Sequence, residues 1–183
     1  MLKKLLYTIL FISTITVDAQ SVFIDKAGEV SFFSEAPLEN IEAKHAGMNS
    51  ILNTDKNELA FIVPIRGFKF EKELMQEHFN EKYMESDKFP NASYKCTLLD
   101  SVKWQTPGTY TVRSTGKFSM HGVEKEITEA GTFTIEGNKI SLHSEFRIAI
   151  ADYGIEIPKL LFQNIADTIL VKLHSQFEPF KKK

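Results

Sequence analysis

The chain has 183 residues, of which 43% are hydrophobic and 25% charged, and its formal charge is −2 at neutral pH. This near balance of charge supplies no basic surface, so a nucleic-acid partner is not expected. The length fits one domain with a sizeable core. The single cysteine, Cys96, excludes an internal disulfide, and its place in the strand-like sequence ASYKCTLL predicts a buried, unreactive thiol.

The first residues have the pattern of an export signal. Two lysines precede an apolar run, residues 5–17, and the sequence Val17-Asp18-Ala19 is typical of a cleavage site. We therefore expect residues 1–19 to be a signal peptide cleaved near Ala19, a single domain over residues 20–183, and a periplasmic or secreted location. The run is shorter than the roughly 20 apolar residues of a membrane span. A retained membrane anchor stays open as the alternative.

Alternation of apolar and polar residues predicts strands over most of the chain. In residues 110–120, for example, large apolar side chains fall on even positions, whereas most odd positions carry threonine, serine, arginine or lysine. The pair Gly137-Asn138 predicts a hairpin turn between two such segments. The predicted strands cover residues 29–34, 59–65, 92–99, 110–120, 127–135, 140–150 and 169–177.

Three segments fit this pattern less simply. Residues 40–53 are treated as a loop, and whether this loop or His45 gates the interior stays open. At Gly67 the apolar residues change from odd to even positions, which predicts a β-bulge that keeps Phe68 and Phe70 facing inward. Trp104, in the turn-like sequence SVKWQTPG, is expected at an exposed or rim position.

Two segments have helical spacing instead. In residues 71–85, Met75, Phe79 and Tyr83 are four apart, which predicts an amphipathic helix of three to four turns. Residues 158–167 begin with proline, a residue favoured at the first position of a helix, and predict a shorter second helix. Antiparallel strands joined by turns, with these small helical additions, indicate an all-β sandwich or barrel.

The sequence MQEHFNEKYMESDKFPNASY, residues 75–94, resembles the helix–turn–strand signature of the YceI-like family, bacterial periplasmic proteins that bind lipids and polyisoprenoids. The matching positions are Glu77, His78, Phe79, Ser86, Asp87, Phe89 and Pro90. Met75, Gln76 and Glu77 stand where the family has an Arg-Asp pair, so the resemblance is to a divergent branch. A second match is the sequence DYGI at residues 152–155. The resemblance extends from about residue 30 to residue 177.

The resemblance implies an extended, lipocalin-like antiparallel β-barrel of about eight strands, which holds one long isoprenoid or acyl chain along its axis. Such an exported protein would sequester or transport a lipid and would need no cofactor. The expected ligand-binding residues are the inward aromatic side chains, one methionine, and a histidine that would touch the head group: Phe32, Phe61, Phe68, Phe70, Phe79, Tyr83, Phe89, Tyr94, Phe118, Met120, Phe133, Phe146 and His78.

Periodicity alone leaves another interpretation open. The same aromatic residues could fill a solid core, and the protein would then be a structural or interaction module that acts through its surface. The resemblance further implies a homodimer paired through the barrel surface. Three C-terminal lysines, residues 181–183, would either attract an anionic membrane transiently or form a solvated end.

Catalysis is not expected from the sequence. No nucleophile or phosphate-loop motif is present. His78 and Glu81 could share a helical face and bind a metal ion, but no third ligand can be identified. A small enzyme that depends on His78 or a metal is the weakest of the three hypotheses.

Overall fold

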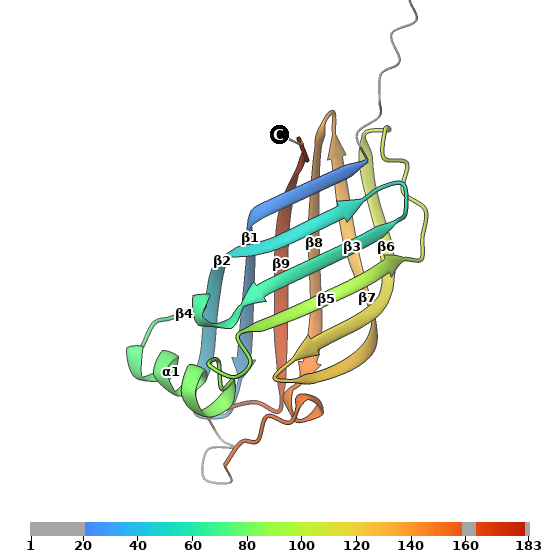
Figure 1. Cartoon of the computed structure of the whole chain (residues 1–183). Coiled ribbons are helices and arrows are strands. Elements are labelled where there is room, and N and C mark those ends of the chain that lie inside the picture. The colour runs from blue at the N-terminus through green and yellow to red at the C-terminus, as the bar shows by residue number, and fades with distance from the viewer. Residues whose placement is uncertain (1–20, 159–163, 182–183) are drawn as a thin grey trace, which may run out of the picture.

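The computed structural model describes residues 21–158 and 164–181, and the predicted signal peptide lies outside them. Within this part of the chain, eight long strands and one two-residue strand alternate with short helical turns (Figure 1). The strands are β1 (Val22–Glu35), β2 (Asn40–Asn53), β3 (Glu58–Pro64), β4 (Lys69–Phe70), β5 (Asn91–Leu98), β6 (Gly108–Met120), β7 (Val123–Glu136), β8 (Lys139–Ala149) and β9 (Thr168–Pro179). The helical elements are α1 (Glu73–His78), a π-helical turn, η2 (Phe79–Tyr83), and two 3₁₀ turns, η1 (Ile65–Gly67) and η3 (Ile150–Tyr153).

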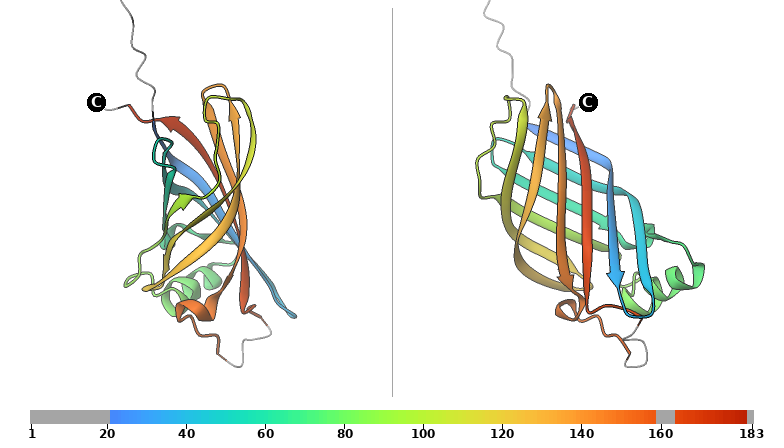
Figure 2. Two further views of the ribbon diagram at one scale, coloured as in Figure 1. Left: turned by 90° about the vertical axis from the view of Figure 1, so that its right-hand side faces the viewer. Right: turned by 180° about the vertical axis from the view of Figure 1, so that it is seen from behind.

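The eight long strands close into one antiparallel barrel. Their order is β1-β9-β8-β7-β6-β5-β3-β2, and β2 pairs back onto β1. The short strand β4 adds to β2 near one end. Figures 1 and 2 show α1 and η3 at that same end of the barrel, opposite the β7–β8 turn. The predicted lipocalin-like barrel of about eight strands is confirmed.

Side-chain alternation explains which residues enter the barrel. On β5 the buried residues Ala92, Tyr94, Cys96 and Leu98 alternate with more exposed polar ones. The same period holds on β8, where Lys139 meets Glu136 across the hairpin turn predicted at residues 137–138. Burial on the inner face is the main source of stability for such strands, at about 25 cal/mol per Å² of apolar surface.

The interpretation of residues 40–53 as a loop was wrong, because they form the 14-residue strand β2. Its inward residues include Ala43 and His45 on one side of Gly47, and Met48 and Ser50 on the other. The inward set therefore shifts by one position at Gly47, whose φ of +142° favours glycine. Small and polar inward residues, together with this shift, hide the period of the strand.

The predicted bulge at Gly67 is instead the 3₁₀ turn η1. The imidazole of His45, a buried residue of β2, packs under this turn. A β-carbon on Gly67 would lie 2.2 Å from its Nε2 atom. Phe68 follows the turn and is buried, with its ring 5.5 Å from that of His45. His45 is thus an interior packing residue between two backbone segments.

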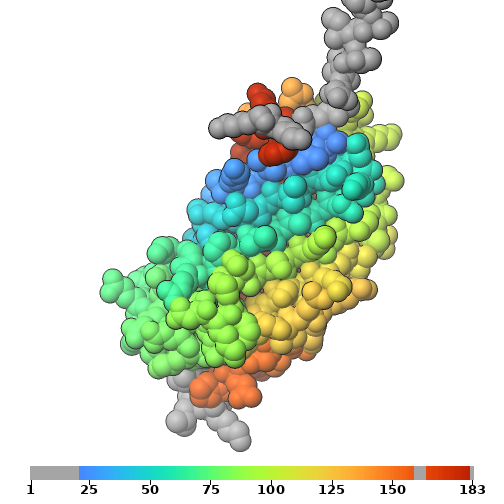
Figure 3. Space-filling model, viewed as in Figure 1, coloured from blue at the N-terminus to red at the C-terminus, as the bar shows by residue number. Residues whose placement is uncertain are grey.

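The helix predicted over residues 71–85 is present as α1 followed by η2, and Figure 3 shows these residues covering one end of the barrel. The second predicted helix is not supported where it can be followed. Pro158 and residues 164–167 are not helical, and residues 159–163 lie outside the described part. In the described ranges, no helix is long and apolar enough to cross a membrane.

Trp104 lies in the β5–β6 connection, at the end of the barrel opposite α1. This agrees with the predicted rim position. However, its ring is half-buried, with its centroid 5.1 Å from the Phe133 ring in an edge-to-face contact. The indole N–H points to Asn57 Oδ1 at 3.4 Å. The tryptophan therefore closes this end of the barrel over the core.

Candidate functional site

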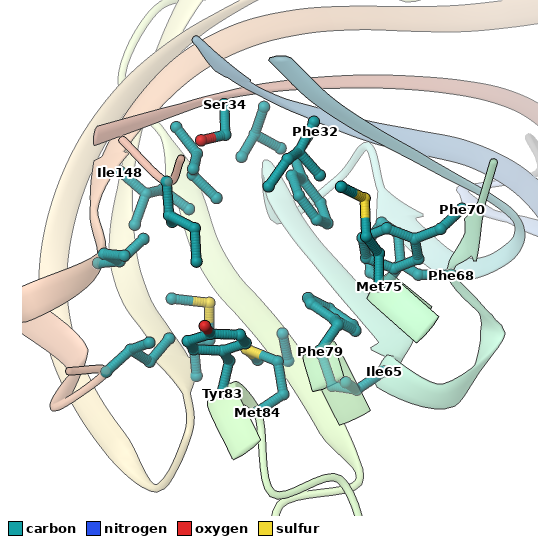
Figure 4. Close-up of a pocket in the computed structure, with 18 of the residues that line it drawn as sticks. Phe32, Ser34, Ile65, Phe68, Phe70, Met75, Phe79, Tyr83, Met84 and Ile148 are labelled. Atoms are coloured by element: carbon teal, nitrogen blue, oxygen red, sulfur yellow. The ribbon is translucent and has the colours of Figure 1, made fainter. Parts of the chain in front are cut away.

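An apolar cavity of about 320 Å³ occupies the half of the barrel nearest α1 (Figure 4). Strands on all sides contribute to it, with Val30 and Phe32 from β1, Ala92 from β5, and Ile148 from β8. Its wall is nearly all hydrocarbon. The volume is at the lower end of the range of about 300–1,000 Å³ typical of small-molecule sites.

Four phenylalanine rings form one side of this cavity. Phe79 on η2 is stacked on Phe32 of β1 with ring centroids 5.5 Å apart, and it also contacts Phe70 of β4 at 5.0 Å and Phe68 at 5.6 Å. Such pairs contribute about 0.5–1.5 kcal/mol each beyond the area they bury. In Figure 4 these rings border the open centre of the cavity. The cluster thus joins α1 and η2 to the barrel and supplies an aromatic wall.

The polar side chains of the lining lie mostly at the α1 end. Glu39, in the β1–β2 turn, accepts a hydrogen bond from Lys72 Nζ at 2.6 Å. This hydrogen bond, with the charge of Glu39, raises the pKa of Lys72. His78 on α1 and Asn164 complete this group, while burial raises the pKa of the Tyr83 hydroxyl. A polar head group could contact these side chains while its chain lies deeper.

His121, in the β6–β7 turn, holds together the chain segments at the α1 end of the site. Its Nδ1 donates to the carbonyl oxygen of Tyr153 at 3.0 Å, and its Nε2 lies 3.0 Å from Glu85 Oε2. The ring of Phe89 packs edge-on against the imidazole at 4.7 Å. Three chain segments therefore meet at one histidine. The segments on either side of it carry Met84 and Ile150, which line the cavity.

The structure brings nine of the thirteen predicted ligand-binding residues to this cavity. They are Phe32, Phe68, Phe70, His78, Phe79, Tyr83, Phe118, Met120 and Phe146. For those on strands the inward face was predicted correctly, and His78, Phe79 and Tyr83 reach the cavity from α1 and η2. Their contact with a ligand stays a prediction.

The other four predicted residues lie elsewhere. Phe61 and Tyr94, partners across β3 and β5, are too far from α1 and border a separate cavity of only about 30 Å³. Phe133 is fully buried between Trp104 and Phe177. Phe89 packs on His121 at the α1 end and does not line the main cavity.

Sequence reasoning missed the aliphatic part of the wall. Ile148 and Ile150 continue the inward face that Phe146 begins, and Ile169 and Val171 belong to the same face of the last strand. The period-2 pattern contained this information. The prediction overlooked it because it selected aromatic residues by type.

Within residues 21–158 and 164–181 no three His, Cys, Asp or Glu side chains are grouped to hold a metal ion. His78 and Glu81 thus have no third ligand in this part of the chain. Burial raises the pKa of Glu129, an inward carboxylate of β7 at the small cavity, and it also raises the pKa of the Tyr94 hydroxyl. Tyr94 is held by Ser114, whose Oγ is 3.1 Å from the phenol oxygen.

A family model of the YceI-like domain matches residues 12–177 of the chain. The chain belongs to the YceI-like family. This match includes the helix–turn–strand segment and the DYGI sequence, the two motifs on which the resemblance was based. A search of curated proteins gave no match.

Solved structures with the same fold come from several bacteria. This YceI-like chain matches BcnA of Burkholderia cenocepacia with a TM-score of 0.70 and 13% identity, covering 82% of this chain and 95% of that one. A polyisoprenoid-binding domain of Saccharophagus degradans, implicated in plant cell wall breakdown, matches with a TM-score of 0.74 and 14% identity, covering 88% of this chain and 99% of that domain. The Campylobacter jejuni YceI protein matches with a TM-score of 0.57 and 12% identity, covering 100% of both chains. At these identities the likeness shows a shared fold and a divergent sequence.

Proposed function

We propose that this protein is an exported, non-catalytic carrier that holds the apolar chain of a lipid, an isoprenoid or a fatty-acid derivative, inside the barrel. The observation that carries the proposal is the cavity of about 320 Å³ beside α1, with its nearly all-hydrocarbon wall. A similar barrel in Saccharophagus degradans is described as a polyisoprenoid-binding domain, which supports the same class of ligand.

The energetics of such binding favour long chains. Burial contributes about 0.8 kcal/mol per methylene group, so ten groups contribute about 8 kcal/mol. Association costs about 4–15 kcal/mol in lost freedom of motion. Because the two terms are similar at about ten groups, a much shorter chain would escape, and each further buried group would tighten binding. Met75, Met84 and Met120 in the wall suit such a ligand, since flexible thioethers adapt to irregular shapes.

The filled-core alternative receives less support. Half of the barrel is indeed packed solid around Phe133, but the half beside α1 is hollow. Unless it is occupied, an apolar cavity of this size costs stability, because the atoms that line it lack packing partners. A cavity kept at this cost favours a binding function over a purely structural one.

The proposal is tested by native mass spectrometry of the protein purified without detergent, followed by organic extraction of whatever stays bound. We expect a stoichiometric apolar adduct. In the variant Phe79→Asp the adduct should be lost, because a carboxylate then faces the cavity. The matched control is Phe33→Asp, since Phe33 is the outward neighbour of Phe32 on β1 and does not line the cavity. A wild-type protein that is free of adduct and takes up no added lipid would refute the proposal.

A further inference from the structure

The cavity ends at a common level on neighbouring strands. On β8, Phe146 lines it, whereas the next inward residue away from α1, Ser144, does not. On β9, Val171 lines it and Leu173 does not. The register of the two strands sets Phe146 opposite Val171 and Ser144 opposite Leu173. The boundary is therefore a level across the barrel, beyond which the interior changes from hollow to filled.

The half beyond this boundary is tightly packed. Phe133 and Leu52 are 0% exposed, and the rings of Trp104 and Phe177 both pack against Phe133. The small cavity there, of about 30 Å³, has room for one or two water molecules at most. A hydrocarbon chain could enter this half only by displacing close-packed side chains, which costs as much as overpacking a core.

Buried polar groups also join three neighbouring strands of the filled half, β2, β1 and β9. Ser50 on β2 and Ser175 on β9 are buried, with their Oγ atoms 2.6 Å apart, and Ser175 donates to Asp25 Oδ2 at 2.7 Å. The same carboxylate oxygen accepts the N–H of Gln176 at 2.9 Å. These hydrogen bonds hold the three strands together, and the packed side chains between the strands close this half of the barrel to a ligand chain.

The depth that remains sets the length of the ligand. The lining residues on β8 and η3 run from Phe146 to Ile150, four residue steps of about 3.3 Å, or roughly 13 Å. With carbon–carbon bonds of about 1.5 Å, this depth holds on the order of ten carbons of an extended chain, and somewhat more of a bent one. We propose that the ligand is an amphiphile whose buried chain has on the order of ten to fifteen carbons, or two to three isoprene units. This inference rests on the proposed function and narrows it.

The test is a length series of neutral amphiphiles. Linear alcohols of 8 to 20 carbons and isoprenoid alcohols of 10, 15 and 20 carbons are titrated into the delipidated protein, and Kd is measured by calorimetry. Below this limit on chain length, each added methylene should lower Kd about fourfold, which corresponds to about 0.8 kcal/mol per buried group. Above roughly 15 carbons the gain should stop, because further carbons stay in water. A rise that continues to 20 carbons would overturn the limit alone, whereas no binding at any length would remove the proposed function as well.

A single variant should move the limit. Phe146 lines both the main cavity and the small one beyond it, so Phe146→Ala joins the two. We expect the break, the chain length at which affinity stops rising, to shift by two or more carbons towards longer chains. Phe33→Ala, which removes a ring outside the cavity, should leave the break unchanged. An unchanged break in folded Phe146→Ala would contradict the position assigned to the boundary, and the wild-type series tests the limit even if that variant does not fold.

Discussion

Gly116 on β6 lies so close to Lys95 on β5 that a β-carbon on the glycine would be 2.1 Å from the Lys95 carbonyl oxygen. The same β-carbon would lie 2.5 Å from the Cα of Cys96. Both neighbours are backbone atoms, which cannot rotate away as a side chain can. The two strands thus approach each other at a point where only glycine fits.

Gly116→Ala should therefore destabilise the barrel by about 2–3 kcal/mol or more, the cost of overpacking a rigid site. The matched control is Gly131→Ala on β7, where a β-carbon would meet the terminal Cδ1 of Leu142 at 3.0 Å. That methyl group can shift, and alanine costs less backbone entropy than glycine, so we expect a change below about 1 kcal/mol. Urea unfolding of both variants measures the difference. Equal losses would mean that β5 and β6 can separate locally.

The Asp100–Arg113 pair should make the free energy of unfolding depend on pH in the acidic range. Arg113 donates to Asp100 through its backbone N–H at 2.8 Å and its side chain at 3.1 and 3.0 Å. The side-chain hydrogen bonds, followed by the backbone one, lower the pKa of Asp100 from 3.8 to about 2. Because the folded-state pKa is the lower one, the stabilisation is complete above about pH 4 and disappears as the pH falls to about 2.

This dependence is measured against Asp100→Asn, which cannot ionise. The difference in unfolding free energy between wild type and variant should be constant from pH 5 to 7 and should shrink between pH 4 and 2. A difference that stays the same down to pH 2 would show that the pair does not depend on the charge of Asp100.

The fold could be predicted where the inward residues were large and apolar. Strands such as β5 and β8 have a clean period of two, so both their positions and their inward faces were correct. β2 was missed because Gly47 shifts its period and because His45 and Ser50 are polar residues that face inward. Their burial depends on partners from distant segments, such as Ser175 on β9, which a local pattern does not contain.

The hollow half of the barrel could not be predicted in the same way. Alternation gives the direction of a side chain but not its height along the barrel axis. Phe118 and Phe133 both point inward, yet Phe118 lines the cavity and Phe133 is enclosed. The difference is due to Trp104, which arrives from the β5–β6 connection and covers Phe133. Packing between remote segments decides which aromatic residues are free to meet a ligand.

Cys96 should be unreactive in the folded protein. Its Sγ is buried and points to the carbonyl oxygen of Leu59 at 3.5 Å, and burial raises the pKa of the thiol from 9.0 to about 11. At pH 8 we expect no reaction with Ellman's reagent until urea unfolds the chain. Because the unfolded thiol ionises first, stability should also fall as the pH rises from about 9 to 11. Rapid labelling of the native protein would show that β3 and β5 open at low cost.

His121 should contribute more to stability than the exposed His143. Its ring contacts the carbonyl oxygen of Tyr153, the carboxylate of Glu85 and the ring of Phe89 at the α1 end of the barrel. His121→Ala removes these contacts and leaves a carbonyl group without its partner, so we expect a loss of about 1–3 kcal/mol. His143→Ala, at an exposed position on β8, should change stability by less than about 0.5 kcal/mol. Both are measured by urea unfolding at pH 7, and hydrogen exchange should show faster opening of residues 84–90 and 150–155 in His121→Ala alone. If the two variants unfold at the same urea concentration, the three segments are held together by their apolar contacts and not by the histidine.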